Sequence, residues 1–231
     1  MKLLRKEVTP EYAAGEAAVA NVSMATMQVG ASVLTGNLGF VGESLHNVGD
    51  GASFWAKRTA MNAEPKKSLR MRRIGASIFA LGGVSGISAA AYEFTSRYEE
   101  STSTLAMGIA IACAGLNTYV AKRTHKAAKN EETGETVHLC DHDHHDHTHE
   151  HEEAVSVQKD AAFQKKAALF DTKLHAFNDA GTGWLYVVGL ALQKYGVHDA
   201  ATFAVGLNGI AATSGAGFTL NRVRRDSLKS Q

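Results

Sequence analysis

The 231-residue sequence has only two cysteines and lacks the motifs that mark common enzymes. Cys113 lies in an apolar segment and Cys140 lies beside a histidine-rich tract, so no disulfide framework is implied. The chain contains no nucleophile–base pair, nucleotide-binding motif or nucleic-acid-binding patch. Its first residues carry charge, but no apolar run follows them, so a cleavable signal peptide is not expected. These absences predict a protein that is neither an enzyme nor a binder of nucleic acid.

Charge is also missing from four long stretches, although 45 % hydrophobic residues would suit an ordinary soluble protein. These stretches, 17–42, 74–92, 101–121 and 200–221, contain 26, 19, 21 and 22 residues. Each is long enough to cross a hydrocarbon core of about 30 Å as a helix. Two further stretches reach that length only by including a few ionisable residues. The six expected spans are about 14–35, 38–56, 74–93, 102–121, 167–193 and 199–221.

The pattern therefore predicts an all-α membrane protein with six transmembrane helices in one domain, 13–225. Polar tails are expected at 1–12 and 226–231, and no folded cytoplasmic domain is expected after the sixth helix. With a cytoplasmic N-terminus, 22 of the 24 lysines and arginines fall on the cytoplasmic side, including Lys57 and its neighbours in an expected loop, 57–73. This positive-inside asymmetry favours a multi-pass protein with both termini in the cytoplasm. We expect a bacterial cytoplasmic membrane, and the alternative is a soluble helical bundle rich in alanine and glycine.

Two matched histidine–aspartate pairs stand inside the expected second and fifth spans. His46 precedes Asp50 by four residues and His175 precedes Asp179 by four, a spacing that puts both side chains on one helix face. Ionisable groups in the middle of a span are costly and persist where they line a cavity or a transport path. Two imidazoles and two carboxylates favour Zn(II), with Co(II), Cd(II) and Ni(II) as alternatives. The competing interpretation is a set of polar residues with a structural role.

Two further acidic residues lie one helical turn from the pairs. If the second and fifth helices run antiparallel, Glu43 lies toward the outside of the site and Asp171 toward the cytoplasm. We expect Asp171 to help admit metal and Glu43 to help release it or exchange protons. Asn47 and Asn178 each neighbour a predicted ligand, and either support the ligands by hydrogen bonds or pack helices together.

A histidine-rich tract lies in the long polar interval 122–165, which is expected to form a cytoplasmic loop. Seven of the 11 histidines occur here, interleaved with acidic residues. This composition cannot build a core, but it binds divalent metal ions in many exchanging geometries. The expected loop ligands are His138, His142, His144, His145, His147, His149 and His151.

With these features together, the chain resembles the cation diffusion facilitator family of divalent-metal transporters. The likeness covers about 14–225 and includes both HxxxD motifs and a histidine-rich loop between the fourth and fifth spans. It implies a homodimer that exports zinc from the cytoplasm by proton antiport and alternating access, with metal bound by His46, Asp50, His175 and Asp179. Zinc is then the cargo, and no resident cofactor is expected.

The chain also departs from the family pattern. Many members carry a ferredoxin-like domain after the sixth helix, and Glu43 stands where an aspartate is more usual. A second hypothesis therefore stays open: a membrane protein that binds or senses metal without transporting it, or a subunit of a larger transporter assembly.

Overall fold

A computed structural model describes residues 8–96, 103–135 and 149–229, and all regular structure in these ranges is α-helical. The elements are α1 (Pro10–Thr35), α2 (Gly39–Met61), α3 (Pro65–Ser96), α4 (Thr104–Glu135), α5 (His149–Lys194) and α6 (Ala200–Lys229). The expected all-α class and six-helix count are confirmed for the described residues.

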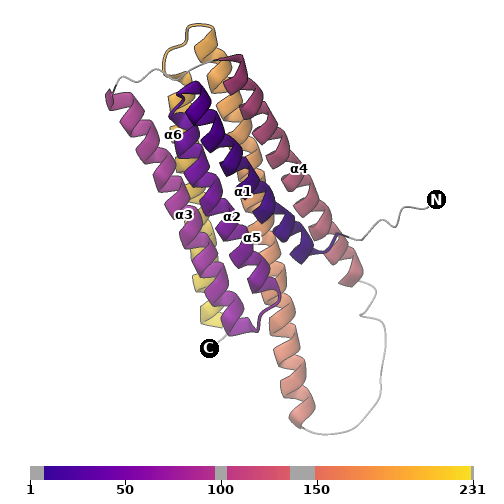
Figure 1. The fold of residues 1–231 in the computed structure, drawn as a ribbon. Helices are drawn as coiled ribbons and strands as arrows, with labels where there is room; N and C mark the ends of the chain where they lie inside the picture. The colour runs from indigo at the N-terminus through magenta and orange to yellow at the C-terminus, as the bar shows by residue number, and fades with distance from the viewer. Residues whose placement is uncertain (1–7, 97–102, 136–148, 230–231) are drawn as a thin grey trace, which may run out of the picture.

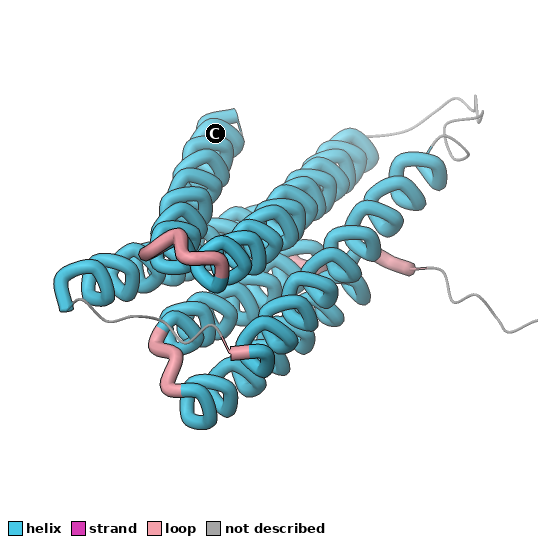
Figure 2. The backbone as a smooth tube through the Cα atoms, turned by 90° about the horizontal axis from the view of Figure 1, so that it is seen from above, coloured by secondary structure: helices cyan, strands magenta, loops and turns pink. Residues whose placement is uncertain are grey.

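The helices form one elongated bundle in which consecutive helices run in opposite directions (Figure 1). Around the bundle α1 packs on α2 and α4, α3 packs on α2 and α6, and α5 packs on α4 and α6. α2 also contacts α5, so the two helices that carry the HxxxD motifs face each other. Figure 2 shows the bundle from above, with short loops joining helix ends.

The two ends of the bundle differ in what they carry. The turn end holds the connections 36–38 and 195–199, and the terminal end holds the start of α1 and the end of α6. At the turn end, Gly36 adopts a left-handed φ of 69° that stops α1, and Oδ1 of Asn37 accepts a hydrogen bond from the Phe40 backbone N–H at 3.3 Å. These local signals bring α2 back against α1.

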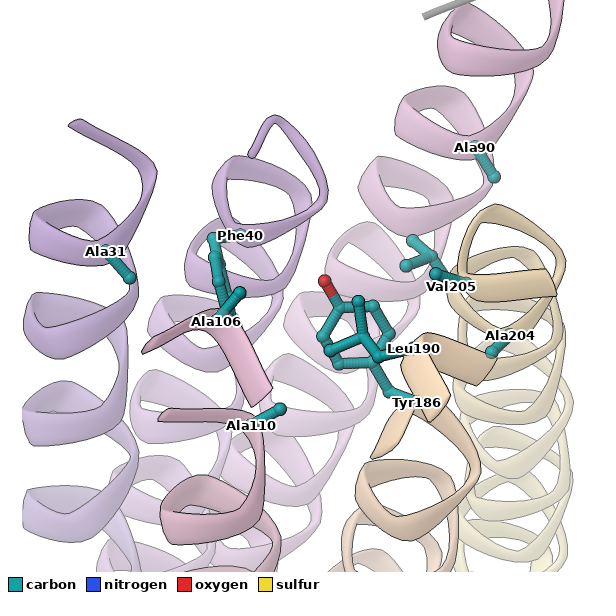
Figure 3. Packing of buried hydrophobic residues seen from close by; sticks show 10 residues of the cluster. Ala31, Phe40, Ala90, Ala106, Ala110, Tyr186, Leu190, Ala204 and Val205 are labelled. Carbon is teal, nitrogen blue, oxygen red and sulfur yellow. The ribbon is translucent and has the colours of Figure 1, made fainter. Parts of the chain in front are cut away.

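The first contact layer at the turn end is apolar. Figure 3 shows Phe40, Tyr186, Leu190 and Val205 directed into the space between helices. The rings of Phe40 and Tyr186 meet edge to face at a centroid distance of 6.0 Å. Alanines from α1, α3, α4 and α6 fill the remaining positions: Ala31, Ala90, Ala106, Ala110, Ala201 and Ala204. We call these ten residues the turn-end cluster.

Elsewhere the distribution of polarity is opposite to that of a soluble protein. The interior contains Arg72, Lys57 and Asp50, each at most 2 % exposed, while large apolar side chains such as Val33 and Leu81 lie outside, 80 % and 69 % exposed. α1, α3, α4 and α6 are long and apolar enough to cross a membrane. Among the described residues α2 and α5 do not belong to that set. Four helices are thus compatible with a membrane protein.

Several helices are longer than the charge-free stretches that predict them. α3 begins at Pro65, so the expected loop 57–73 is largely helical, and proline suits this first helical position. The described parts of the polar interval 122–165 are also helical, because α4 reaches Glu135 and α5 begins at His149. Their alanine, lysine and glutamate residues are good helix formers. α6 likewise runs on to Lys229, into the expected tail 226–231.

An ion-pair cluster joins α5 to α4 and α1 at the terminal end. Lys165 on α5 lies 2.8 Å from an Oε1 of Glu131 on α4 and 3.3 Å from Oε1 of Glu11 on α1. Burial acts to lower the pKa of Lys165, but the two carboxylates outweigh it and raise the pKa above its usual value. The extensions therefore have contacts of their own.

Candidate metal centre

Both HxxxD motifs lie on the faces that α2 and α5 turn toward each other. On α2, His46, Asp50, Ser53 and Lys57 recur at intervals of three or four residues and are buried. This is the spacing of one helix face. On α5, Asp171, His175 and Asp179 recur at intervals of four and are buried as well. The two faces together make a polar column inside the bundle.

Asp50 is the residue that joins the two motifs. Its Oδ2 lies 3.2 Å from Nε2 of His46 on the same helix, and its Oδ1 lies 3.0 Å from Nε2 of His175 on α5. Nε2 of His175 also lies 3.4 Å from Oδ2 of Asp179. The four residues predicted as ligands therefore meet at one place between α2 and α5.

Three of these four residues form a group that could hold a metal ion. His46, Asp50 and Asp179 each offer one ligand atom within 4.8 Å of the others. His175 touches both carboxylates but stands outside that group. Imidazole nitrogen and carboxylate oxygen are common zinc ligands, and a tetrahedral site takes four of them. Three of the four ligands of a His₂Asp₂ site are therefore grouped, and the fourth, His175, lies beside them.

Most side-chain polar atoms of the four predicted ligands have no hydrogen-bond partner among the described residues. These atoms are Nδ1 and Nε2 of His46, both carboxylate oxygens of Asp50, both of Asp179, and Nε2 of His175. The ion-pair distances above lack the angles of hydrogen bonds. A buried polar atom without a partner costs roughly 1–3 kcal/mol. A divalent cation would satisfy several of these atoms at once, so the donor set fits a metal ion.

Aromatic rings and a close helix approach fix the position of the two histidines. The ring of His175 stacks on Phe54 at a centroid distance of 4.3 Å and on Phe79 of α3 at 3.6 Å. At Gly82 of α3, an added Cβ would lie only 3.2 Å from Nδ1 of His46. Glycine thus allows α3 to approach His46, and Phe54 and Phe79 hold the imidazole of His175 in one orientation. The sequence pattern predicts none of these contacts, because those of Phe79 and Gly82 depend on how α3 packs and that of Phe54 depends on how α2 meets α5.

Lys57 does not lie in a loop. It is 2 % exposed, and its Nζ contacts Nδ1 of His175. The Nζ atom also lies 5.2 Å from the ring centroid of Phe54 and 5.4 Å from that of Phe79. The assignment of Lys57 to a basic loop is therefore wrong, because α2 continues to Met61. The interval of seven residues from Asp50 was the signal that could have found it.

A buried charge network lies between the candidate centre and the terminal end. Nε of Arg72 on α3 donates to Oδ2 of Asp171 at 2.8 Å, and its Nη1 donates to Asp226 of α6 at 2.9 Å. The same nitrogen donates to Oε1 of Gln164, and Arg222 adds a bond to Oδ1 of Asp171 at 3.2 Å. Asp171, expected to admit metal, is thus engaged by two arginines.

A hydrogen bond between α2 and α6 lies on the turn-end side of the centre. Nδ2 of Asn208 on α6 donates to Oε1 of Glu43 at 3.0 Å. Asn47 donates to Gln28 of α1 at 2.7 Å, which is a helix-packing role. Asn178 lines a small cavity beside Lys57, and its Nδ2 has no hydrogen-bond partner. Neither asparagine has a hydrogen bond to a predicted ligand.

The predicted loop ligands fall largely outside the residues that the structure describes. His138, His142, His144, His145 and His147 lie outside the described residues, and His149 and His151 belong to the first turn of α5. The loop-ligand prediction stays a prediction.

The sequence matches no family model, and no curated protein shows significant similarity to it. The fold and the buried histidine–aspartate group are therefore the basis for a functional assignment.

Proposed function

We propose that this protein transports a divalent transition-metal ion, zinc before cobalt, cadmium or nickel, across a membrane in exchange for protons. The observation that carries the proposal is the buried meeting point of His46, Asp50, His175 and Asp179, whose polar atoms largely lack hydrogen-bond partners. Ionisable residues inside a membrane bundle typically mark an ion path.

Six spans, rather than four, are supported by the outer faces of α2 and α5. Leu45, Val48 and Trp55 on α2 are each more than half exposed, while the polar residues of that helix face inward. On α5, Phe177, Trp184 and Val188 are similarly exposed, at 49 %, 45 % and 51 %. The outer surfaces of α2 and α5 are thus apolar, although the average hydropathy of each helix is low. Both helices then cross the membrane with their polar faces turned away from lipid.

Exchange against protons follows from the ligand chemistry. A metal ion binds neutral imidazole and ionised carboxylate, so protons compete with it for the same atoms. An unperturbed histidine titrates in the physiological pH range. The likeness to cation diffusion facilitators supports export from the cytoplasm by a homodimer, with both chain termini in the cytoplasm.

The test is zinc flux in proteoliposomes that contain a zinc indicator and carry a proton gradient. Wild-type protein is expected to move zinc when the gradient is applied, and Asp50→Ala is expected to abolish that flux. Glu64→Gln, a change at an exposed acidic residue outside the helices, serves as the matched control and should transport normally. Equal flux through Asp50→Ala and wild type would refute the proposal.

A second candidate function is a membrane protein that binds metal without flux. The observation in its favour is the Arg72 network, which closes the terminal-end side of the centre with buried ion pairs. Stoichiometric zinc binding without any gradient-driven flux would select this function.

A further inference from the structure

A surface groove of about 610 Å³ is lined by residues of α1, α2 and α4. α1 supplies most of the lining at intervals of three or four residues, which is the spacing of one helix face. α2 adds Arg58, and α4 adds Leu116 and Tyr119. The four predicted metal ligands are not among the lining residues, so the groove is separate from the candidate metal centre.

The groove has an apolar half and a polar half. Val19 and Leu116 line the apolar half, and both belong to charge-free stretches of the sequence. Glu16 lies just before the first of these stretches, and Arg58 lies just beyond the expected second span. In a six-span arrangement, the groove therefore runs from the hydrocarbon core to the level of the lipid head groups.

Aromatic side chains stand at the same level as the polar half. Tyr12 and Tyr119 line the groove, and Trp55 lies one turn before Arg58 on α2. Each of these three side chains is more than half exposed. Tyrosine and tryptophan are enriched where a membrane meets water, because their rings are apolar and their polar atoms reach the head groups. The aromatic residues thus support a lipid–water boundary at the polar half of the groove.

The two arginines beside the groove differ in their partners. Nε and Nη2 of Arg123 donate to the two carboxylate oxygens of Glu16 at 2.9 Å and 3.1 Å, so these two charges neutralise each other. Arg58 forms no ion pair with a carboxylate in the part of the chain that the structure describes. Its Cζ instead lies over the ring of Trp55, 5.1 Å from the centroid. The groove therefore keeps one net positive charge, that of Arg58.

The guanidinium of Arg58 is seated against the backbone of α1. A Cβ added at Gly15 would lie 3.2 Å from Nη1 and 3.4 Å from Cζ of Arg58. The missing side chain at Gly15 thus lets the guanidinium lie in the wall of the groove. A guanidinium carries five N–H donors in a planar fork that matches the oxygens of a phosphate group. The groove therefore offers a phosphate-binding group beside an apolar channel.

We propose that this groove binds an anionic phospholipid, with its phosphate on Arg58 and an acyl chain along Val19 and Leu116. A lipid with a net negative head group matches both halves of the groove, whereas inorganic phosphate matches only the polar half. The lipid site rests on the membrane placement of α2 in the proposed function, but it is independent of metal binding and flux.

The test is quenching of Trp55 by brominated lipids, with the full-length protein in phosphatidylcholine vesicles. The chain has two tryptophans, so Trp184→Phe leaves Trp55 as the only reporter. Brominated phosphatidylglycerol is expected to bind beside Trp55 about fivefold more tightly than brominated phosphatidylcholine with the same acyl chains, because one basic residue near the surface favours an anionic lipid by about that factor. Equal quenching by the two lipids, or quenching by neither, overturns the proposal.

A charge-matched pair of variants locates the preference. In the Trp184→Phe chain, Arg58→Gln should abolish the preference for phosphatidylglycerol, and Arg58→Lys should keep part of it because the charge remains. Arg70→Gln removes the same charge from an exposed position on α3 and should leave the fivefold preference intact. If Arg70→Gln lowers the preference as much as Arg58→Gln does, general surface charge attracts the lipid and the groove is not its site.

A second variant tests the seat without changing any charge. Gly15→Leu fills the space beside the guanidinium and should lower the preference, which also covers the case that Arg58→Gln does not fold. An unchanged preference in Gly15→Leu overturns the proposal.

Inorganic phosphate and zinc separate this site from its alternatives. Millimolar inorganic phosphate at constant ionic strength should leave the lipid preference unchanged, and loss of the preference would assign the site to free phosphate instead of lipid. Zinc flux is measured on the same vesicles. A fivefold lipid preference without zinc flux would refute the proposed transport and support the lipid site, whereas zinc flux without a lipid preference would do the reverse.

Discussion

The two sides of the candidate centre are closed by different chemistry. Toward the turn end, the described residues pack in the apolar turn-end cluster, with Phe40 against Tyr186, and Asn208 donates a hydrogen bond to Glu43. Toward the terminal end, Arg72 gathers Asp171, Asp226 and Gln164 into a buried network.

The two kinds of closure would open in different ways. Apolar packing is lost gradually as helices separate, and its strength depends on shape more than on individual partners. A buried ion pair is different, because removing one partner leaves an uncompensated charge. In an alternating-access cycle, the terminal-end side would therefore behave as the more switch-like closure.

The largest expected effect comes from breaking the terminal-end network. Arg72→Met leaves Asp171 and Asp226 buried with fewer partners and should destabilise the protein by about 3–5 kcal/mol. Thermal unfolding in detergent micelles checks this. Arg70→Met, at an exposed position on the same helix, should have little effect. Similar melting temperatures for the two variants would contradict the proposed difference between the two sides.

The next effect comes from the apolar side. Phe40→Ala removes a fully buried ring from the turn-end cluster and should cost roughly 3 kcal/mol through the cavity that it leaves. Phe203→Ala, 63 % exposed on α6, is the control for loss of a surface ring. If both changes shift thermal unfolding equally, the cluster does not behave as a packed core.

A smaller effect is expected at the hydrogen bond between Asn208 and Glu43 on the turn-end side. Asn208→Ala removes the donor to Glu43, and interhelical hydrogen bonds in membranes contribute about 1 kcal/mol. Its unfolding should therefore shift less than that of Arg72→Met. A shift as large as that of Arg72→Met would mean that both sides depend on charge.

The smallest effect is expected at the partly exposed ion pairs of the terminal end. Lys165→Met breaks contacts with Glu11 and Glu131, and such pairs contribute about 0.5 kcal/mol or less. The change should shrink further in high salt, because exposed charges are screened. A loss of stability that is large and independent of salt would place Lys165 with the buried network.

The sequence is sufficient to predict the helices and the pairing of the two motifs. Charge-free runs indicate four helices, and the matched HxxxD spacing indicates that α2 and α5 face each other. The helix ends are harder to predict. Lysine, glutamate and arginine are good helix formers, but a search for charge-free stretches assigns charged segments to loops. Arg72 and Phe79 escape prediction for another reason: their roles come from contacts with residues about 100 positions away in α5, such as Asp171 and His175.

The most direct test of the central claim is zinc content after the histidine tract has been silenced. In a chain with the seven tract histidines replaced by asparagine, purified protein should retain one zinc ion per chain, measured by elemental analysis. Adding Asp50→Asn to that chain should remove the ion. If the chain without tract histidines already holds no zinc, the centre formed by His46, Asp50, His175 and Asp179 is not a metal site.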